Sequence, residues 1–227
     1  DCQSAQKCHA DLFPDDLDKD ALTAYGFSMP ETAFAANMNT TIRDFPQKPY
    51  IIFDGLTGKG CSASMWHVKT DYDSEHGYCA KVSYPSQYYN LKLYLPKKIS
   101  EKVAAGRKEL CVSFSAKFTN SKQEFFLHLT DFDGGESLPP WRNTVCVKAS
   151  DYKSGEWVRI KIPLSKFSES GAYSDKAGKW FNPKSDFDWK RLDCLYFEFS
   201  DPKNVMQGDI FIDDVTIGIS SIFPATD

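Results

Sequence analysis

The most regular feature of the sequence is an alternation of apolar and polar residues that recurs in short segments from Tyr50 onward. The segment 110–118, LCVSFSAKF, has an apolar face at every second position, and the segments 124–132, 156–164 and 193–200 show the same period. Successive side chains of a β-strand point to opposite faces, so the alternation predicts antiparallel strands with one buried side. The sequence therefore predicts an all-β fold, a jelly-roll β-sandwich of two antiparallel sheets.

The alternation is absent from the first 47 residues, which are acidic near their start and have no helix or strand period. We expect an irregular N-terminal extension or linker over residues 1–47 and the β-sandwich over residues 48–227. Within the sandwich, only the segment 99–108, ISEKVAAGRK, has helical character, and one or two helical turns are expected there.

A net charge of −4 argues against binding to a phosphate backbone, so no nucleic-acid partner is expected. No apolar run approaches the roughly 18 residues of a membrane span, and no membrane partner is expected either.

Aromatic residues make up 15 % of the chain, and large flat side chains suit both the stacking of sugar rings and the core of a sandwich. A secreted or cell-surface monomer is expected.

Seven cysteines without a CxxC spacing favour disulfides over a zinc ribbon. Cys2 with Cys8, and Cys61 with Cys79, are the candidate pairs, and an odd count leaves at least one thiol free. Burial as small hydrophobic residues is an equally good interpretation of Cys111 and Cys194.

Two carboxylates interrupt the apolar strand 207–218, QGDIFIDDVTIG. In a regular strand, Asp213 shares a face with Phe211, Val215 and Ile217, and Asp214 lies on the other face. An unpaired carboxylate among apolar side chains is costly. Pairing with an arginine, exposure to solvent, or a calcium ion would each remove that cost, and Asp54 and the loop 71–77 offer further oxygens for calcium.

The segment 87–96 has a second face with tyrosines beside hydrogen-bonding groups: Tyr88, Asn90, Lys92 and Tyr94. Tyr196 and Glu198 share a face of the strand 193–200, and His128 lies on the polar face of its strand. Such a surface suits a sugar cleft, but an ordinary hydrated face rich in tyrosine has the same pattern.

Three classes of protein remain open from the residues alone. A jelly-roll glycoside hydrolase would need paired carboxylates, and DFDGGE offers Asp131, Asp133 and Glu136. The Gly-Gly pair within that run favours instead a strand that ends in a turn. A sugar-binding module and a non-sugar adhesion domain at the cell surface are the other two classes.

The tryptophans divide into two groups by their surroundings. Trp66 and Trp157 are expected to pack in the domain, whereas Trp141 and Trp180 lie among prolines and glycines and are candidates for exposed loops.

The order and spacing of IIFDG, GEWVRIKIPLSKF and LDCLYFEFSDP…GDIFIDDVTIG resembles the family-11 carbohydrate-binding modules of bacterial β-glucanases, from Tyr50 to about Gly218. The resemblance implies a galactose-binding-like jelly roll without catalytic activity. It also implies a concave cleft for single β-glucan chains, such as mixed-linkage β-1,3-1,4-glucan and cellulosic oligosaccharides, and an appended glycoside hydrolase as partner.

By position, the resemblance places Tyr88 and Asp193 in the cleft. Tyr196 stands where the family has a histidine. Tyr173 lies in the loop from which the family contributes another tyrosine to the cleft. The family's arginine and aspartate before that loop tyrosine are not evident here, and Cys194 replaces a serine. It also implies a structural calcium between the first and last strands, with Asp54 and Asp213 as ligands. The resemblance and the polar faces of the predicted strands together give the predicted carbohydrate-binding residues: Tyr88, Asn90, Tyr94, His128, Tyr173, Asp193, Tyr196 and Glu198.

Overall fold

The computed structural model describes residues 45–55, 62–201, 203 and 205–222. The chain divides into two compact units, residues 1–39 and 40–227, and all of the described residues belong to the second unit. Most of the predicted N-terminal extension, together with Cys2, Cys8 and Cys61, therefore lies outside the described residues. Phe45 is 2 % exposed and belongs to the core of the sandwich.

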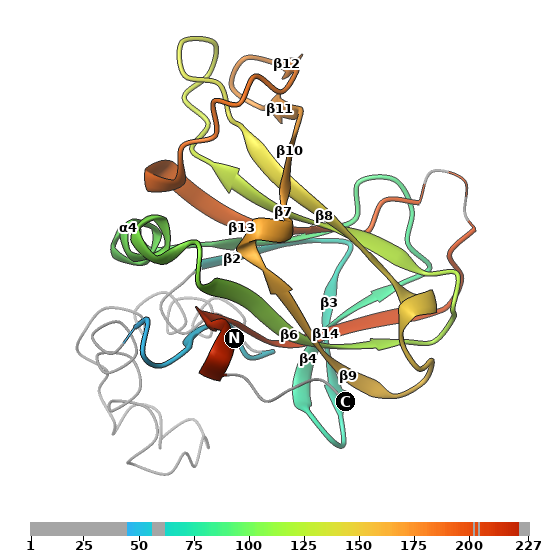
Figure 1. Cartoon of the computed structure of the whole chain (residues 1–227). Helices are drawn as coiled ribbons and strands as arrows, with labels where there is room; N and C mark the ends of the chain where they lie inside the picture. Colours follow the sequence, from blue (N-terminus) through green and yellow to red (C-terminus); the bar gives the residue numbers. More distant parts are fainter. Residues whose placement is uncertain (1–44, 56–61, 202, 204, 223–227) are drawn as a thin grey trace, which may run out of the picture. The chain divides into compact units, whose positions relative to one another are not determined.

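Two six-stranded antiparallel sheets form the domain, as the alternation predicts (Figure 1). The first sheet has the order β3 (Lys69–Asp73), β4 (Gly77–Ser83), β14 (Asp209–Ile219), β6 (Leu110–Phe118) and β9 (Trp157–Pro163), and β1 (Tyr50–Phe53) also pairs with β14. The second sheet has the order β10 (Ser168–Ser170), β8 (Arg142–Lys148), β7 (Glu124–Asp131), β13 (Leu192–Glu198), β5 (Asn90–Tyr94) and β2 (Ser62–Trp66).

Shorter elements complete the described fold. A two-stranded hairpin consists of β11 (Ala172–Ser174) and β12 (Lys179–Phe181). The described residues also form four short 3-10 helices, at Ala149–Asp151, Leu164–Lys166, Trp189–Arg191 and Ser220–Ile222. The helix α4 spans Lys97–Gly106, which is longer than the predicted one or two turns. It extends because Ile99 and Val103, one turn apart, are both 0 % exposed against the core.

The core lies between the inner faces of the two sheets and is rich in phenylalanine. Phe114 of β6 packs against Phe125 of β7 and Phe197 of β13, with ring centroids 6.0 and 5.4 Å apart. All three rings are 0 % exposed, and each buried ring of this size contributes about 1.5–3 kcal/mol to stability. The residues that alternation placed inward are thus the ones that join the sheets.

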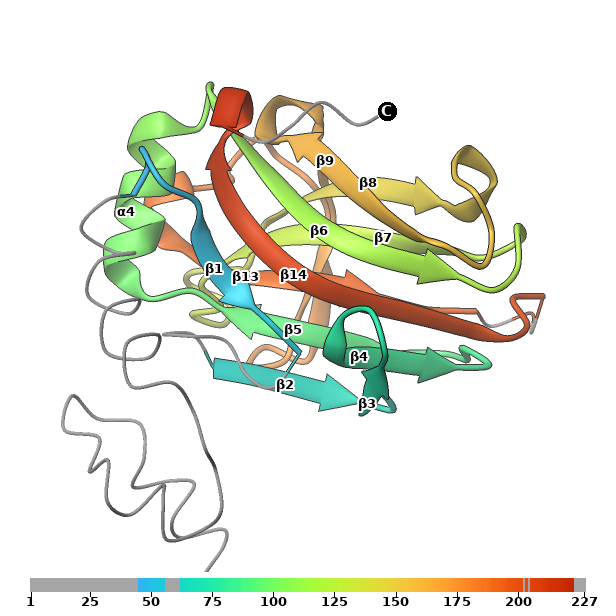
Figure 2. The ribbon, with the colours of Figure 1, turned by 90° about the horizontal axis from the view of Figure 1, so that it is seen from below.

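The long strand β14 contains a β-bulge, which corrects the predicted assignment of its faces. Asp213 pairs with Ser115 and Thr216 pairs with Ser113, so two residues of β14 stand opposite one residue of β6. Asp214 takes a positive φ of 49° at this point. The face of β14 that points to the core therefore shifts by one residue, and the buried isoleucine and valine residues on the two sides of the bulge are Ile210, Ile212, Val215 and Ile217. Figure 2 shows β14 running between β1 and β6.

The state of Cys79 is not consistent with the predicted disulfide between Cys61 and Cys79. Cys79 is a buried free thiol whose Sγ lies 3.7 Å from the carbonyl oxygen of Asp71. Cys111 and Cys194 are 0 % and 4 % exposed, which confirms their interpretation as buried small residues. Within the described part of the chain, no helix is both long and apolar enough to cross a membrane.

Candidate functional site

The outer face of the second sheet carries polar and aromatic side chains in rows that cross the strands. These rows follow from the alternation, because the intervening residues of β5, β13 and β7 face the core. One row consists of Lys92, Tyr196, His128 and Thr144, and the next of Tyr94, Cys194, Thr130 and Arg142. The tyrosine-bearing face predicted from the sequence is therefore one continuous surface.

A cleft of about 510 Å³ lies over this surface. Of the eight predicted carbohydrate-binding residues, it brings together six: Tyr88, Tyr94, Tyr173, Asp193, Tyr196 and Glu198. The other lining residues are Lys92, Thr130, Asp131, Phe132, Asp133, Pro140, Arg142, Ala172, Asp175, Lys176, Trp180 and Cys194. Asn90 and His128 do not line the cleft, and both contact residues that do.

The hairpin β11–β12 forms one wall of the cleft and presents two aromatic rings. Tyr173 stands directly opposite Trp180 in the hairpin register, so both side chains lie on the same side of it. They are 54 % and 51 % exposed. The guanidinium of Arg142 lies 5.1 Å from the centre of the Trp180 ring and supports it from the sheet. In Figure 1 the hairpin lies beyond β10 at one end of the second sheet.

The position of the Trp180 ring depends on Gly171. A Cβ atom at residue 171 would lie 2.4 Å from the ring, so the ring occupies the space that a side chain there would need. Glycine is required at this position by the close approach of the ring.

A chain of hydrogen bonds beneath the cleft fixes the tautomer of His128. Arg142 Nε donates to Ser170 Oγ over 3.2 Å, and Ser170 and Thr144 hydroxyls lie 2.6 Å apart. Thr144 Oγ1 lies 2.7 Å from His128 Nδ1, and His128 Nε2 lies 3.0 Å from Glu198 Oε2. Since a carboxylate only accepts, Nε2 carries the proton and Nδ1 accepts from Thr144.

This arrangement keeps His128 neutral and Glu198 charged. His128 is 2 % exposed, and burial lowers the pKa of its imidazole. Burial would raise the pKa of Glu198, but the hydrogen bond from His128 and the nearby charge of Arg142 outweigh it and leave that pKa below its ordinary value. Glu198 therefore presents a carboxylate to the cleft that can accept hydrogen bonds from ligand hydroxyls.

Asn90 supports the cleft through Tyr88. Its Nδ2 donates to the carbonyl oxygen of Tyr88 over 2.7 Å. Tyr88 has a positive φ of 70°, an uncommon conformation for a tyrosine, and its ring is 64 % exposed. The hydrogen bond stabilises the backbone conformation that points this ring outward.

The carboxylates of DFDGGE have separate structural partners. Asp131, 1 % exposed at the end of β7, accepts from the backbone of Trp141 and pairs with Arg191 at 2.9 Å. Asp133 accepts from Ser174 of the hairpin over 2.8 Å, and exposed Glu136 pairs with Lys179. This agrees with a strand that ends in a turn, and the three groups connect the turn to its surroundings.

The tryptophans only partly follow their predicted groups. Trp66 is 58 % exposed, so the expected packing is wrong. It stands at the end of β2, which is an edge strand of the sheet that the described residues form. Trp157 packs as expected, with its ring 6.1 Å from that of Phe211. Of the two loop candidates, Trp141 is buried and Trp180 lines the cleft.

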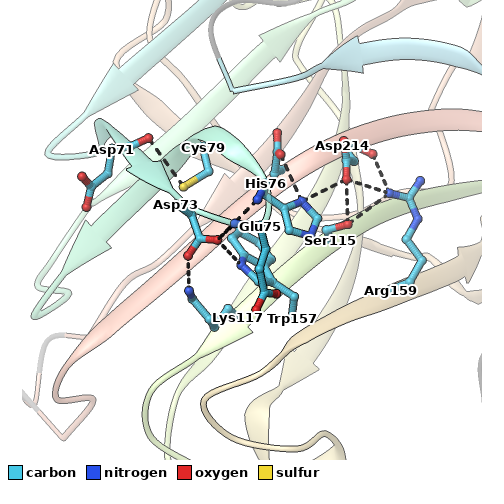
Figure 3. Close-up of polar contacts among 11 residues, drawn as sticks. Asp71, Asp73, Glu75, His76, Cys79, Ser115, Lys117, Trp157, Arg159 and Asp214 are labelled. Atoms are coloured by element: carbon cyan, nitrogen blue, oxygen red, sulfur yellow. Dashed lines mark hydrogen bonds and ion pairs between the residues drawn. The ribbon is translucent and has the colours of Figure 1, made fainter.

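On the first sheet, Asp213 and Asp214 converge on His76, as Figure 3 shows for His76 and Asp214. His76 Nδ1 lies 3.2 Å from Oδ2 of each aspartate. Asp54 follows β1 and is not a member of this group of three. The structure thus gives Asp213 a histidine neighbour that the sequence did not indicate, and the calcium predicted at Asp54 and Asp213 stays a prediction.

Comparison with solved structures finds a likeness in fold to carbohydrate-binding modules. The chain is similar to the family 11 carbohydrate-binding module from Clostridium thermocellum in complex with a β-1,3-1,4-mixed-linked tetrasaccharide: 18 % identity, TM-score 0.50, covering 74 % of this chain and 94 % of that one. The likeness shows that the chain has the fold of this module, in agreement with the sequence resemblance.

Two further similarities have lower TM-scores. The family 11 module of the cellulosomal cellulase Lic26A-Cel5E of Clostridium thermocellum matches at 17 % identity and a TM-score of 0.49, over 76 % of this chain and 95 % of that one. The family 30 module of the cellulosomal cellulase Cel9D-Cel44B of the same organism matches at 13 % identity and 0.44, over 76 % and 94 %. No family model and no curated protein matches the sequence.

Sequence reasoning missed Arg142 and Lys176 of the cleft, and it left the role of Trp180 open. Arg142 follows a proline-rich turn at the first position of β8, and its sequence context does not distinguish it from any other arginine. Trp180 had a signal, since an aromatic residue among glycines and prolines favours an exposed loop.

Proposed function

We propose that this chain is a non-catalytic carbohydrate-binding module that binds single β-glucan chains in the cleft of its second sheet. Mixed-linkage β-1,3-1,4-glucan and cellulosic oligosaccharides are the proposed ligands. The fold supports this, because the neighbour with the highest TM-score among those described above carries a mixed-linkage tetrasaccharide.

The observation that carries the proposal is the combination of exposed rings and a charged acceptor within one cleft. Tyr173 and Trp180 offer flat apolar surfaces on which the C–H faces of sugars stack. Glu198 offers an ionised carboxylate fixed by His128. Ring stacking together with directed hydrogen bonds is what a pocket needs to bind a polyhydroxylated, uncharged chain.

The proposal includes an extracellular location and an appended glycoside hydrolase. A polymeric glucan that originates outside the cell cannot cross the membrane, so a protein that binds such a chain acts outside. Attachment to an enzyme raises the effective concentration of that enzyme at its substrate, which gives a binding module its benefit even when its own affinity is modest.

Affinity electrophoresis in gels that contain soluble polysaccharides tests the proposal. Wild-type protein should be retarded by mixed-linkage β-glucan more than by xylan or agarose-type galactan. Tyr88→Ala should reduce the retardation several-fold, since an aromatic stacking contact is worth about 0.5–1.5 kcal/mol. Tyr72→Ala is the matched control, because Tyr72 is 68 % exposed on β3 of the other sheet.

A reducing-sugar assay on the same polysaccharides runs in parallel. Retardation without release of reducing ends is the expected result. Equal mobility of wild type and Tyr88→Ala in every gel would contradict the cleft, and release of reducing ends by the wild type would show an enzyme.

A further inference from the structure

The β-bulge of β14 brings two consecutive carboxylates to one place on the first sheet. In a regular strand, neighbouring side chains point to opposite faces, so Asp213 and Asp214 would be separated. The two-against-one pairing with β6 and the positive φ of Asp214 rotate the second side chain toward the first. Two like charges within 4.8 Å of each other are unfavourable, so this arrangement of carboxylates favours a compensating positive charge.

His76 supplies the third polar atom of the cluster. It lies in the turn between β3 and β4, and its Nδ1 is 3.2 Å from Oδ2 of Asp213 and of Asp214. The three potential ligand atoms all lie within 4.8 Å of one another. A tetrahedral site with metal–ligand bonds of 2.0–2.2 Å has ligand atoms separated by about 3.3–3.5 Å. The two distances from His76 Nδ1 are close to that spacing, and binding of an ion would need only a small adjustment of the two carboxylates.

The imidazole is positioned by its neighbours. The His76 ring stacks on Trp157, with centroids 4.0 Å apart and planes 29° from parallel. Trp157 Nε1 in turn donates to Asp73 Oδ1 over 3.0 Å, and the same oxygen accepts from the backbone of Glu75 and of His76. These contacts, drawn in Figure 3, fix the turn and the orientation of the ring.

The two carboxylates are positioned differently from each other. Asp214 is partly exposed and its Oδ2 accepts from Ser115 Oγ over 3.0 Å, with Arg159 Nη1 3.8 Å away. Asp213 is 2 % exposed, and its Oδ1 is buried without a hydrogen-bond partner within the described structure. A single Nδ1–H cannot satisfy two carboxylates, so the buried Asp213 lacks part of the positive charge that it needs.

We propose that His76, Asp213 and Asp214 form a structural site for a divalent transition-metal ion of the Zn²⁺ class. One imidazole nitrogen and two carboxylate oxygens make a donor set that zinc accepts, with water as a fourth ligand. The hydrogen bonds to Asp214 and the stacking of His76 are the outer contacts that such sites use to orient their ligands.

The donor set distinguishes this site from a calcium site. Calcium takes six to eight oxygen ligands and does not favour an imidazole nitrogen, whereas zinc does. The bound ion would join the β3–β4 turn to the middle of β14, on the sheet that does not carry the cleft. Its effect is on stability and is separable from ligand binding.

The experiment uses the full chain after treatment with a chelator and dialysis. Zn²⁺ should bind at one ion per chain by isothermal titration calorimetry and raise the Tm by at least about 3 °C, because a ligand specific for the folded state stabilises it. Any response of the Tm to the same concentration of Ca²⁺ should be unchanged in His76→Gln, because calcium does not favour an imidazole nitrogen. Co²⁺ in place of Zn²⁺ should give the visible absorption bands of a tetrahedral site.

His76→Gln and Asp214→Asn are the test variants, since neither side chain is fully buried. Each should weaken Zn²⁺ binding at least about tenfold and abolish the cobalt bands. Glu75→Gln, an exposed neighbour in the same turn, is the matched control and should bind as the wild type does. A Tm that responds to Ca²⁺ but not to Zn²⁺, absence of zinc binding, or full binding by both variants would overturn the proposal.

Discussion

The imidazole of His128 lies beneath the carboxylate of Glu198 and donates to it over 3.0 Å, while Thr144 donates to the other ring nitrogen. This relationship links a residue that no ligand can reach to one that lines the cleft. The histidine therefore contributes to the site by fixing the charge and direction of Glu198.

Glu198→Gln should weaken binding of a mixed-linkage glucan oligosaccharide by about tenfold, because a hydrogen bond to a charged acceptor is worth about 1.5–3 kcal/mol and glutamine retains only part of it. Isothermal titration calorimetry measures this directly. Glu101→Gln, on the exposed side of α4, serves as the control and should leave the affinity unchanged. Equal affinities for the two variants would show that Glu198 does not contact the ligand.

Gly171→Ala should reduce ligand affinity by displacing the Trp180 ring, since the new Cβ would lie 2.4 Å from it. The expected loss is close to that of Trp180→Ala, several-fold for one stacking contact. The double variant should be no weaker than Trp180→Ala alone, because the methyl group acts only through the ring. A fully additive double variant would mean that residue 171 acts by another route.

The pH dependence of stability should reveal the neutral state of His128. Burial lowers the pKa of His128 from its ordinary 6.5, so the unfolded chain takes up a proton before the folded chain does. Stability should accordingly fall as the pH decreases from about 6.5 toward the folded-state pKa. Chemical denaturation at several pH values should show a shallower fall for His128→Gln.

An NMR titration of the His128 ring checks the same point in the wild type without a substitution. The resonances should show no protonation near pH 6.5. A midpoint at or above 6.5 would contradict a buried neutral imidazole.

Phe114→Ala should lower the free energy of unfolding by about 3–5 kcal/mol, because the ring is fully buried where the two sheets meet. Urea denaturation followed by fluorescence measures the change. Trp66→Ala removes a similarly large aromatic side chain from an exposed site and should change stability by no more than about 0.5 kcal/mol.

Local patterns predicted the strands and the two-sheet class, because alternation depends only on neighbouring residues. The outward face of β5 and β13 could also be predicted, and with it Tyr94, Tyr196 and Glu198. The residues that cover that face could not be predicted. His128 has the polar-face position expected of an exposed residue, yet it is buried among neighbours that include Thr144 of β8 and Tyr196 of β13.

The bulge at Asp213 and Asp214 illustrates the same limit. Its cause is the pairing of β14 with β6, which are about a hundred residues apart in the chain, and no local pattern marks the extra residue. The contact with His76 depends on that bulge, so the sequence did not indicate the histidine. The calcium that the resemblance implies at Asp54 and Asp213 stays a prediction.

Tyr173 and Trp180 belong to one hairpin, whose two strands form a separate two-stranded sheet among the described residues. Exchange of residues 171–181 for a loop of different composition would leave the interior of the sandwich untouched and replace one whole wall of the binding surface. The same scaffold could in this way be redirected to polysaccharides of other linkage or sugar type by grafting a single short insert.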